Sequence, residues 1–405
     1  MLIGNVMKKY CHAFLFLNIL VSLVCIVNFI PKKLIYNNIY ESINWYKEKE
    51  DFSLIKGYNF SKAHFNSDAA EMNILINNDT KHPLKSTFLS PIYLGSDEES
   101  YLDATYDSVI NNKIANTDYN RYWHGYQILW KPLFILFNEN TIKYIAGILY
   151  ITLILYIIYK CQKIIYKALE IGLLLLNILY IMPCGFVSLS FIPIYFIMML
   201  GCLFLLNKKN PDLIFIILGI STAFFDFLSS ETLTLTIPLL CFMYLYKNDI
   251  KFFDIIKKCI NWICGYTFTF LYKWILSTLI CKENYLKIAI QEYMKHTIKF
   301  DRITSIKYNI NTLMWNKVSF NTSLTILIVF LIIFSLIVYL FRNPNSSWKY
   351  LISILFVCLI PYIRYFIMSG HSIAHHFFTY RAQLVIILGI VLVINEAFLE
   401  KKKGR

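Results

Sequence analysis

The residues best suited to chemistry fall into three groups along the chain. The first is the run 121–126, in which Arg121 supplies a fixed cation and His124 a titratable ring. Trp123 and Tyr126 add aromatic faces that can stack on a sugar ring. The same residue types also suit an aromatic belt at a membrane surface, with one arginine reaching phosphate headgroups. Both interpretations place the run at a membrane interface.

The second group lies between Arg364 and Arg381. His371 and His375 are four residues apart and are expected to share one helix face, and Tyr380 lies beside Arg381. Two neutral imidazoles could bind a metal ion, whereas protonated ones could hold a phosphate or relay a proton. Loop histidines without such a role are the third alternative.

The third group consists of carboxylates. Asp68 and Glu71 lie between apolar stretches, and Asp226 and Glu231 flank a short turn between two apolar runs. Ionisable groups near membrane depth are costly, so a role in a cavity is expected for the latter pair. The acidic run 97–107 is predicted to be a solvated loop face. Asp68 is the strongest candidate for a catalytic base.

The elements that carry these groups are predicted to lie in a membrane. The 405 residues are 57% hydrophobic and 16% charged, whereas about a quarter of a soluble domain is charged. The net charge of +14 comes largely from lysines clustered between apolar runs, which is typical of cytoplasmic loops and indicates no nucleic-acid partner. The ten cysteines include no CxxC pair, so neither a disulfide framework nor a zinc site is predicted.

The chain is expected to cross the membrane about ten times as an all-α polytopic protein. Because every segment assigned to the inside is basic, the N- and C-termini are both predicted to be cytoplasmic, with an uncleaved first span. Apolar runs of near-spanning length lie at 11–30, 143–161, 168–184, 191–206, 211–228, 232–247, 258–276, 322–341, 348–367 and 382–399.

This topology leaves two long outside segments, 31–142 and 277–321. The first is too long for a connector and should be ordered. Within it, 36–52 has apolar residues at helical spacing and is predicted to lie in the membrane interface. The segment 122–130 is predicted to lie on the same surface, ended by Pro132.

The arginines are distributed differently from the lysines, which cluster in the segments predicted to be cytoplasmic. Only six are present, and four of them fall on the predicted outside: Arg121, Arg302, Arg364 and Arg381. Guanidinium groups bind phosphate in a two-pronged manner, so their placement predicts an anionic ligand such as a phosphate or pyrophosphate. No Walker loop, GxGxxG turn, GxSxG elbow or HExxH motif is present. Nucleotide-driven transport and common hydrolase chemistry therefore lack support.

The order of these features resembles the GT-C class of membrane glycosyltransferases. More narrowly, three strings are similar to a group of bacterial polytopic proteins described as GT-C-like: 121–126 followed by 131–133, 226–228 and 371–381. The GT-C resemblance implies that an acidic residue of the first outside loop acts as base or metal ligand, which is Asp68 here with Glu71 as its deputy. In that class the acid lies closer to the first span than Asp68 does.

The resemblance implies a cell-membrane enzyme that moves a sugar from a polyprenyl-phosphate donor to a glycan or lipid acceptor of the cell envelope. Arg121, Arg364 and Arg381 would hold the phosphate. The residues expected to contact the substrate are Trp123, His124, Tyr126, Asp226, His371, His375 and Tyr380. A divalent cation is a candidate cofactor. A carrier or flippase for an anionic lipid-linked glycan, and an envelope glycan polymerase or ligase, are the alternatives.

Overall fold

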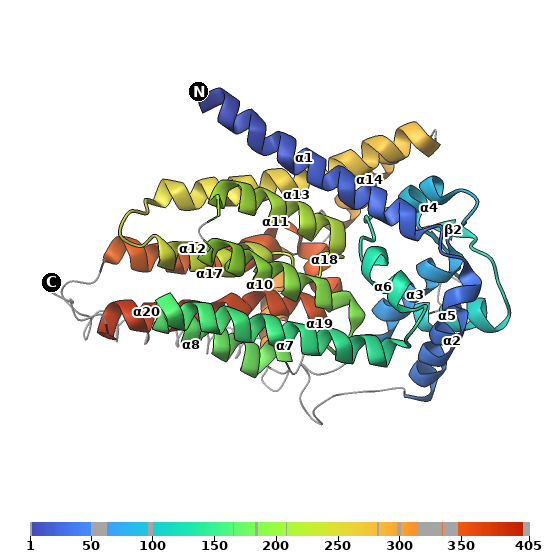
Figure 1. Ribbon diagram of the computed structural model, residues 1–405, viewed down its shortest axis with the longest axis horizontal. Coiled ribbons are helices and arrows are strands. Elements are labelled where there is room, and N and C mark those ends of the chain that lie inside the picture. Colours follow the sequence, from blue (N-terminus) through green and yellow to red (C-terminus); the bar gives the residue numbers. More distant parts are fainter. Residues whose placement is uncertain are drawn as a thin grey trace.

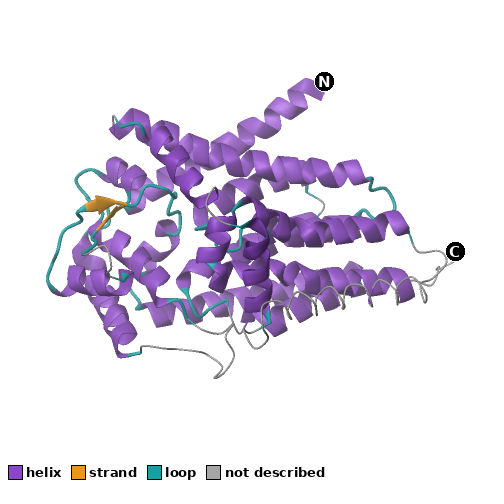
Figure 2. Ribbon diagram, turned by 180° about the vertical axis from the view of Figure 1, so that it is seen from behind, coloured by secondary structure: helices purple, strands orange, loops and turns teal. Residues whose placement is uncertain are grey.

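The computed structural model describes residues 2–49, 63–95, 100–164, 166–182, 185–207, 209–281, 283–297, 301–314, 334 and 347–399. This part of the chain is almost entirely helical. Its strands, β1 (Pro91–Ile92) and β2 (Thr117–Asp118), pair antiparallel in a two-residue ribbon (Figure 2). The all-α prediction is therefore confirmed for these residues.

Six helical stretches of the described residues are long and apolar enough to cross a membrane. They are Met7–Val27 in α1 (Leu2–Val27), α7 (Glu139–Ile164), Leu189–Leu206 in η3 (Leu189–Phe191) and α10 (Ile192–Leu206), α13 (Phe252–Cys281), α17 (Trp348–Ile367), and His376–Phe398 in α19 (His376–Thr379), η4 (Tyr380–Leu384), α20 (Val385–Ile394) and η5 (Asn395–Leu399).

Shorter apolar helices complete the bundle. They are α8 (Lys167–Leu176) with its continuation η2 (Asn177–Ile181), α11 (Pro211–Phe225) and α12 (Leu233–Leu245). Each predicted span other than 322–341 coincides with a helix, and 322–341 lies almost wholly outside the described residues. A membrane protein with several apolar helices is thus supported, while the total of ten spans stays a prediction.

The first long segment forms a helical layer at one end of the bundle, on the right in Figure 1. The layer consists of α2 (Lys32–Glu48), α3 (Phe65–Asn77), α4 (Pro83–Leu89), α5 (Tyr101–Ile110) and α6 (Gln127–Leu133). Ser100 caps α5 by accepting a hydrogen bond from the amide of Asp103, which satisfies one orphan donor of that helix. The order predicted for this segment is therefore present in its described residues.

The apolar stripe of α2 is covered by protein. Ile35, Ile39, Ile43 and Tyr46 are buried in one cluster with residues of α3, α6 and α7. The predicted helix therefore exists, but its apolar face packs on the neighbouring helices instead of a membrane surface. Helical spacing shows that a stripe must be covered, and it does not show by what.

The segment 122–130 is also interior, because Trp123, Tyr126 and Trp130 are buried. Pro132 lies within α6 and does not end it. The second long segment is helical in its described part, where α13 runs on to Cys281 and is followed by α14 (Tyr285–Thr297) and α15 (Arg302–Leu313). Between α17 and α19 lies the short helix α18 (Ser369–Ala374).

The bundle has two chemically distinct ends, which α11 connects. At its first turn Asp212 forms ion pairs with Lys9 of α1 and with Lys258 of α13. At the same end Glu396 of η5 accepts a hydrogen bond from the amide of Ser347. The start of α1 and the end of the described chain therefore both lie opposite the α2–α6 layer. Which compartment each end faces stays a prediction.

Two glycines bring α11 and α13 into backbone contact. A Cβ atom on Gly219 would overlap the carbonyl oxygen of Trp262, and one on Gly265 would overlap the carbonyl oxygen of Ile216. Small residues allow such close crossings of membrane helices, where dispersion contacts between backbones contribute much of the attraction. This crossing fixes the position of the turn that follows α11.

We expect Gly219→Ala to destabilise the protein by about 1–3 kcal/mol, because the two helix backbones would have to separate. Thermal unfolding in detergent measures this effect. Gly147→Ala on α7 is the matched control, since its Cβ would meet only the Phe186 ring at 3.8 Å. Equal melting temperatures for the two variants would contradict the close crossing.

Candidate functional site

Asp68 joins the outer layer to the bundle. It lies in the first turn of α3 and is fully buried. Its Oδ1 accepts hydrogen bonds from the amide and the hydroxyl of Ser190 at 3.1 and 2.6 Å, and its Oδ2 accepts one from the hydroxyl of Tyr46 at 3.0 Å. Because Ser190 belongs to η3 and Tyr46 to α2, one carboxylate connects three elements.

More carboxylates than cations are buried around Asp68. Lys143 of α7 lies 3.5 Å from Asp68 Oδ2, pairs with Glu139 one turn earlier, and donates to the Tyr46 hydroxyl at 3.1 Å. Glu71, one turn after Asp68, is also buried. Among the described residues, Asp68 and Glu139 thus share the Lys143 ammonium group, and Glu71 interacts with the negative charge of both carboxylates. Such a cluster favours a proton on one carboxylate.

Glu71 is the group best placed to hold that proton. Burial raises its pKa well above the ordinary value, and the charges of Asp68 and Glu139 raise it further; Ser190 and Trp130 oppose the shift only in part. Neither carboxylate oxygen of Glu71 has a hydrogen bond of normal geometry within the described chain, although the side chains of Ser190 and Trp130 lie near enough to lower its pKa. A carboxyl group so placed is suited to exchange a proton with a ligand.

A second cluster is centred on Arg364, in the last turn of α17. Its guanidinium pairs with Glu231 through Nε, donates to the Ser372 hydroxyl at 2.7 Å, and donates to the Leu228 carbonyl at 3.0 Å. The nitrogen that donates to Leu228, Nη2, also lies 3.1 Å from His371 Nδ1. Because guanidinium only donates, Nδ1 is the acceptor, which leaves the His371 proton on Nε2.

The turn after α11 shapes this cluster. Asp226 Oδ2 accepts a hydrogen bond from the amide of Ser229 at 3.0 Å, and its Oδ1 accepts one from the Ser229 hydroxyl. Leu228 between them has a φ of 61°, in the left-handed region. That conformation costs a non-glycine residue about 1–3 kcal/mol, and here it accompanies a carbonyl that faces Arg364.

Aromatic rings connect the Arg364 cluster to Asp68. The His371 and His375 rings lie 4.6 Å apart, as their spacing predicts, and His375 stacks on Phe378 at 5.1 Å. Phe378 lies 6.2 Å from Phe191, the residue that follows Ser190. The Arg381 guanidinium lies over the Phe191 ring at 4.1 Å. Arg381 is therefore next to the element that binds Asp68.

Tyr380 belongs to the same group of side chains, because its ring lies 5.4 Å from the Arg381 guanidinium.

The run 121–126 provides a second connection between Glu71 and the turn that carries Asp226. Tyr126 donates a long hydrogen bond of 3.5 Å to the backbone carbonyl of Glu71, and its ring lies 5.4 Å from Phe227. Phe227 follows Asp226 in the turn beside Arg364. Two sets of contacts therefore join the carboxylates to the Arg364 cluster, one through Phe378 and Phe191 and one through Tyr126 and Phe227.

His124 is held in a strained position within this run. Its φ is 53°, and its Nε2 lies 2.6 Å from the carbonyl of Tyr119, which makes Nε2 the donor. Burial and the charge of Lys273 lower its pKa well below the ordinary value, so the ring is neutral. The next residue is Gly125, where a larger residue would not fit because its Cβ atom would collide with Phe224.

Two predicted residues contact other parts of the protein. The Trp123 ring stacks on Phe224 at 5.1 Å, and its indole nitrogen donates to the carbonyl of Thr269 at 2.8 Å. The ring is therefore enclosed in the core between α11 and α13, where a sugar has no access to its faces. The Arg121 guanidinium lies over the Tyr119 ring at 5.1 Å.

The sequence did not single out Glu139, Lys143, Ser190 or Tyr46 as site residues. A usable signal was present for the first two, because they are charged residues four apart at the start of an apolar run. No sequence signal marked Ser190 as a site residue. In the described residues, no group of three or more His, Cys, Asp or Glu side chains is arranged to hold a metal ion. A cation cofactor stays a prediction.

Comparison of the chain with protein-family models, with curated proteins and with solved structures finds no match.

The pKa shift of Glu71 predicts how stability depends on pH. Above about pH 4.5 the unfolded chain loses this proton while the folded chain keeps it, so native stability falls as pH rises towards the folded pKa. Glu71→Gln should remove this loss. The variant should gain stability relative to the native chain by up to about 1.4 kcal/mol per pH unit.

Thermal unfolding between pH 4.5 and pH 7 measures this difference. Glu48→Gln, at the exposed end of α2, is the matched removal of one carboxylate. A stability difference between Glu71→Gln and the native chain that stays constant over this range would show that Glu71 is ionised in the folded protein.

Proposed function

We propose that this protein is a GT-C-type membrane glycosyltransferase that moves a sugar from a polyprenyl-phosphate donor to a cell-envelope acceptor. The observation that supports it most is the contiguity of acidic and cationic groups at one end of the bundle. Asp68 is connected to Arg381 through Ser190 and Phe191, and Glu71 lies one turn after Asp68 on α3. Sugar transfer from a phosphate donor needs a proton acceptor beside cations that stabilise the departing phosphate.

In this proposal the two inner arginines have different roles. Arg381 lies next to Phe191, on the side of the carboxylates, and would hold the departing phosphate. The Arg364 guanidinium already donates hydrogen bonds to Glu231, Ser372, the Leu228 carbonyl and His371. It therefore acts as a positioning residue for His371. With its proton on Nε2, His371 can donate a hydrogen bond to the phosphate or to a sugar hydroxyl.

The proton is assigned to Glu71 instead of Asp68. The oxygens of Asp68 accept three hydrogen bonds, so this side chain is better suited to hold its neighbours in place. Glu71 would take the proton of the acceptor hydroxyl while that oxygen bonds to the anomeric carbon and the carbon–phosphate oxygen bond breaks with its electron pair leaving on phosphate. Its raised pKa makes the carboxylate a stronger base.

The distribution of polar groups favours a transferase over a carrier. In the described bundle, charged clusters lie at the two ends, around Asp212 and around the site. The buried polar contacts along its depth are neutral, such as the hydrogen bond of 2.7 Å from Tyr150 to Asn177. A carrier for an anionic glycan would need polar groups along the whole path.

We expect Glu71→Gln to lower sugar transfer by about 100-fold or more, because general base catalysis typically contributes a factor of this size or larger. The full-length chain is assayed in membranes that contain lipid-linked sugars, and envelope glycans are compared with and without it. Glu48→Gln is the control and should transfer normally. In the native chain the rate should rise with pH, because only ionised Glu71 accepts a proton.

Normal transfer by Glu71→Gln would contradict its role as base. A polymerase or ligase that needs no base at this position would then be the better explanation. Failure of the native chain to change any envelope glycan would contradict the proposed function as a whole.

A further inference from the structure

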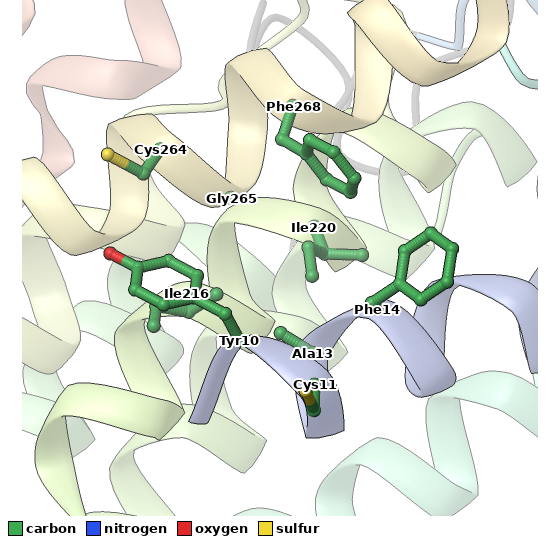
Figure 3. A pocket seen from close by; sticks show the side chains of 9 residues that line it. All are labelled: Tyr10, Cys11, Ala13, Phe14, Ile216, Ile220, Cys264, Gly265 and Phe268. Carbon is green, nitrogen blue, oxygen red and sulfur yellow. The ribbon is translucent and has the colours of Figure 1, made fainter. Parts of the chain in front are cut away.

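An apolar groove lies on the outer surface of the bundle, away from the site described above. It is formed between α1 and α13, with α11 as its floor, and has a volume of about 480 Å³. Figure 3 shows the side chains that line it: Tyr10, Cys11, Ala13, Phe14, Ile216, Ile220, Cys264, Gly265 and Phe268. The close crossing at Gly265 keeps α11 near enough to α13 to form this floor.

The groove continues directly into a basic cluster at the predicted cytoplasmic end. On α11, Asp212, Ile216 and Ile220 are spaced four residues apart and therefore lie on one face. On α13, Lys257 and Lys258 precede Cys264 by about two turns. The charged cluster and the apolar floor thus follow each other over about 12 Å along α11, at 1.5 Å per residue.

The basic cluster carries an excess of positive charge. Asp212 is 2.6 Å from Lys9 and 3.2 Å from Lys257, and it also pairs with Lys258. Three ammonium groups therefore surround one carboxylate. The Lys257 side chain is 50% exposed, so it can reach a ligand outside the protein. Clusters of this kind between membrane helices attract anionic lipid headgroups.

We propose that this groove and its basic end bind one anionic phospholipid of the surrounding bilayer. A hydrocarbon chain would occupy the apolar groove, where α1 and α13 are candidate membrane spans and lipid tails are the solvent. The phosphate would lie against Lys9, Lys257 and Lys258. Charge complementarity selects an anionic headgroup over a zwitterionic one. The inference is independent of the proposed transferase activity.

The test uses the full-length chain, purified in a neutral detergent and titrated with phosphatidylglycerol or with phosphatidylcholine of the same acyl chains. Native mass spectrometry measures the bound lipid. We expect phosphatidylglycerol to bind more tightly. Lys257→Gln should weaken it about fivefold, which corresponds to about 1 kcal/mol for one lysine near a charged surface. Lys160→Gln on α7, away from the groove, is the control and should leave binding unchanged.

The groove is tested by Cys264→Phe, which fills it from an exposed position and should reduce lipid binding at least fivefold. Its control is Ile263→Phe on the same helix, since Ile263 is exposed and does not line the groove. Soluble glycerol phosphate should compete poorly, because it has no chain to bury.

Equal binding of the two lipids, or equal behaviour of Lys257→Gln and Lys160→Gln, would overturn the headgroup assignment. Equal behaviour of Cys264→Phe and Ile263→Phe, or full competition by glycerol phosphate, would overturn the role of the groove. A dimer that dissociates in Cys264→Phe without loss of bound lipid would assign the groove to a second copy of the chain and overturn the proposal.

Discussion

The arrangement of the candidate site depends on one buried carboxylate. Asp68 has no exposed surface, and an ionised group in such a place must be matched by donors or a cation. Its donors come from η3 and α2, and its cation comes from α7. The outer layer is therefore held on the bundle by a polar contact that tolerates little displacement, whereas apolar packing alone would allow sliding.

The second consequence concerns where backbone strain is located. His124 and Leu228 both have left-handed backbone conformations, and both lie at the boundary between the layer and the bundle. Residues held in this way cluster at functional sites, because the surrounding structure has to support them. The carbonyl of Leu228 faces Arg364, and His124 presents a neutral ring beside Phe227. Among the described residues, Ser90 and Asn112 also have a left-handed φ, so His124 and Leu228 are the two of four such residues that lie beside the acidic and cationic groups.

The sequence was most informative where a pattern is local. Apolar runs located the helices of the bundle, and the spacing of His371 and His375 predicted their adjacent rings. The sequence was least informative about which side chains, distant along the chain, contact a given residue. The sequence pattern predicts a membrane surface for the stripe of α2 and a sugar or the membrane interface for Trp123, although protein covers both. An aromatic or apolar residue has the same local pattern whether lipid, ligand or another helix covers it.

The assignment of Asp68 and Glu71 shows the same limit at the level of chemistry. Both could be selected from the sequence as acidic residues between apolar stretches. Their separate roles depend on Ser190, Tyr46 and Lys143, which are distant in sequence and carry no shared motif. Only the three-dimensional arrangement shows that Asp68 is already bonded, while Glu71 is buried with an excess of negative charge around it.

The most direct test of this account is a double-mutant cycle between Asp68 and Ser190 that uses Asp68→Asn, Ser190→Ala and the combined variant. Unfolding free energies of the four proteins in detergent give the coupling between the two side chains. Hydrogen bonds to a buried charge predict a coupling of about 1.5–3 kcal/mol. Additive effects, with a coupling near zero, would show that Asp68 does not hold the outer layer on the bundle.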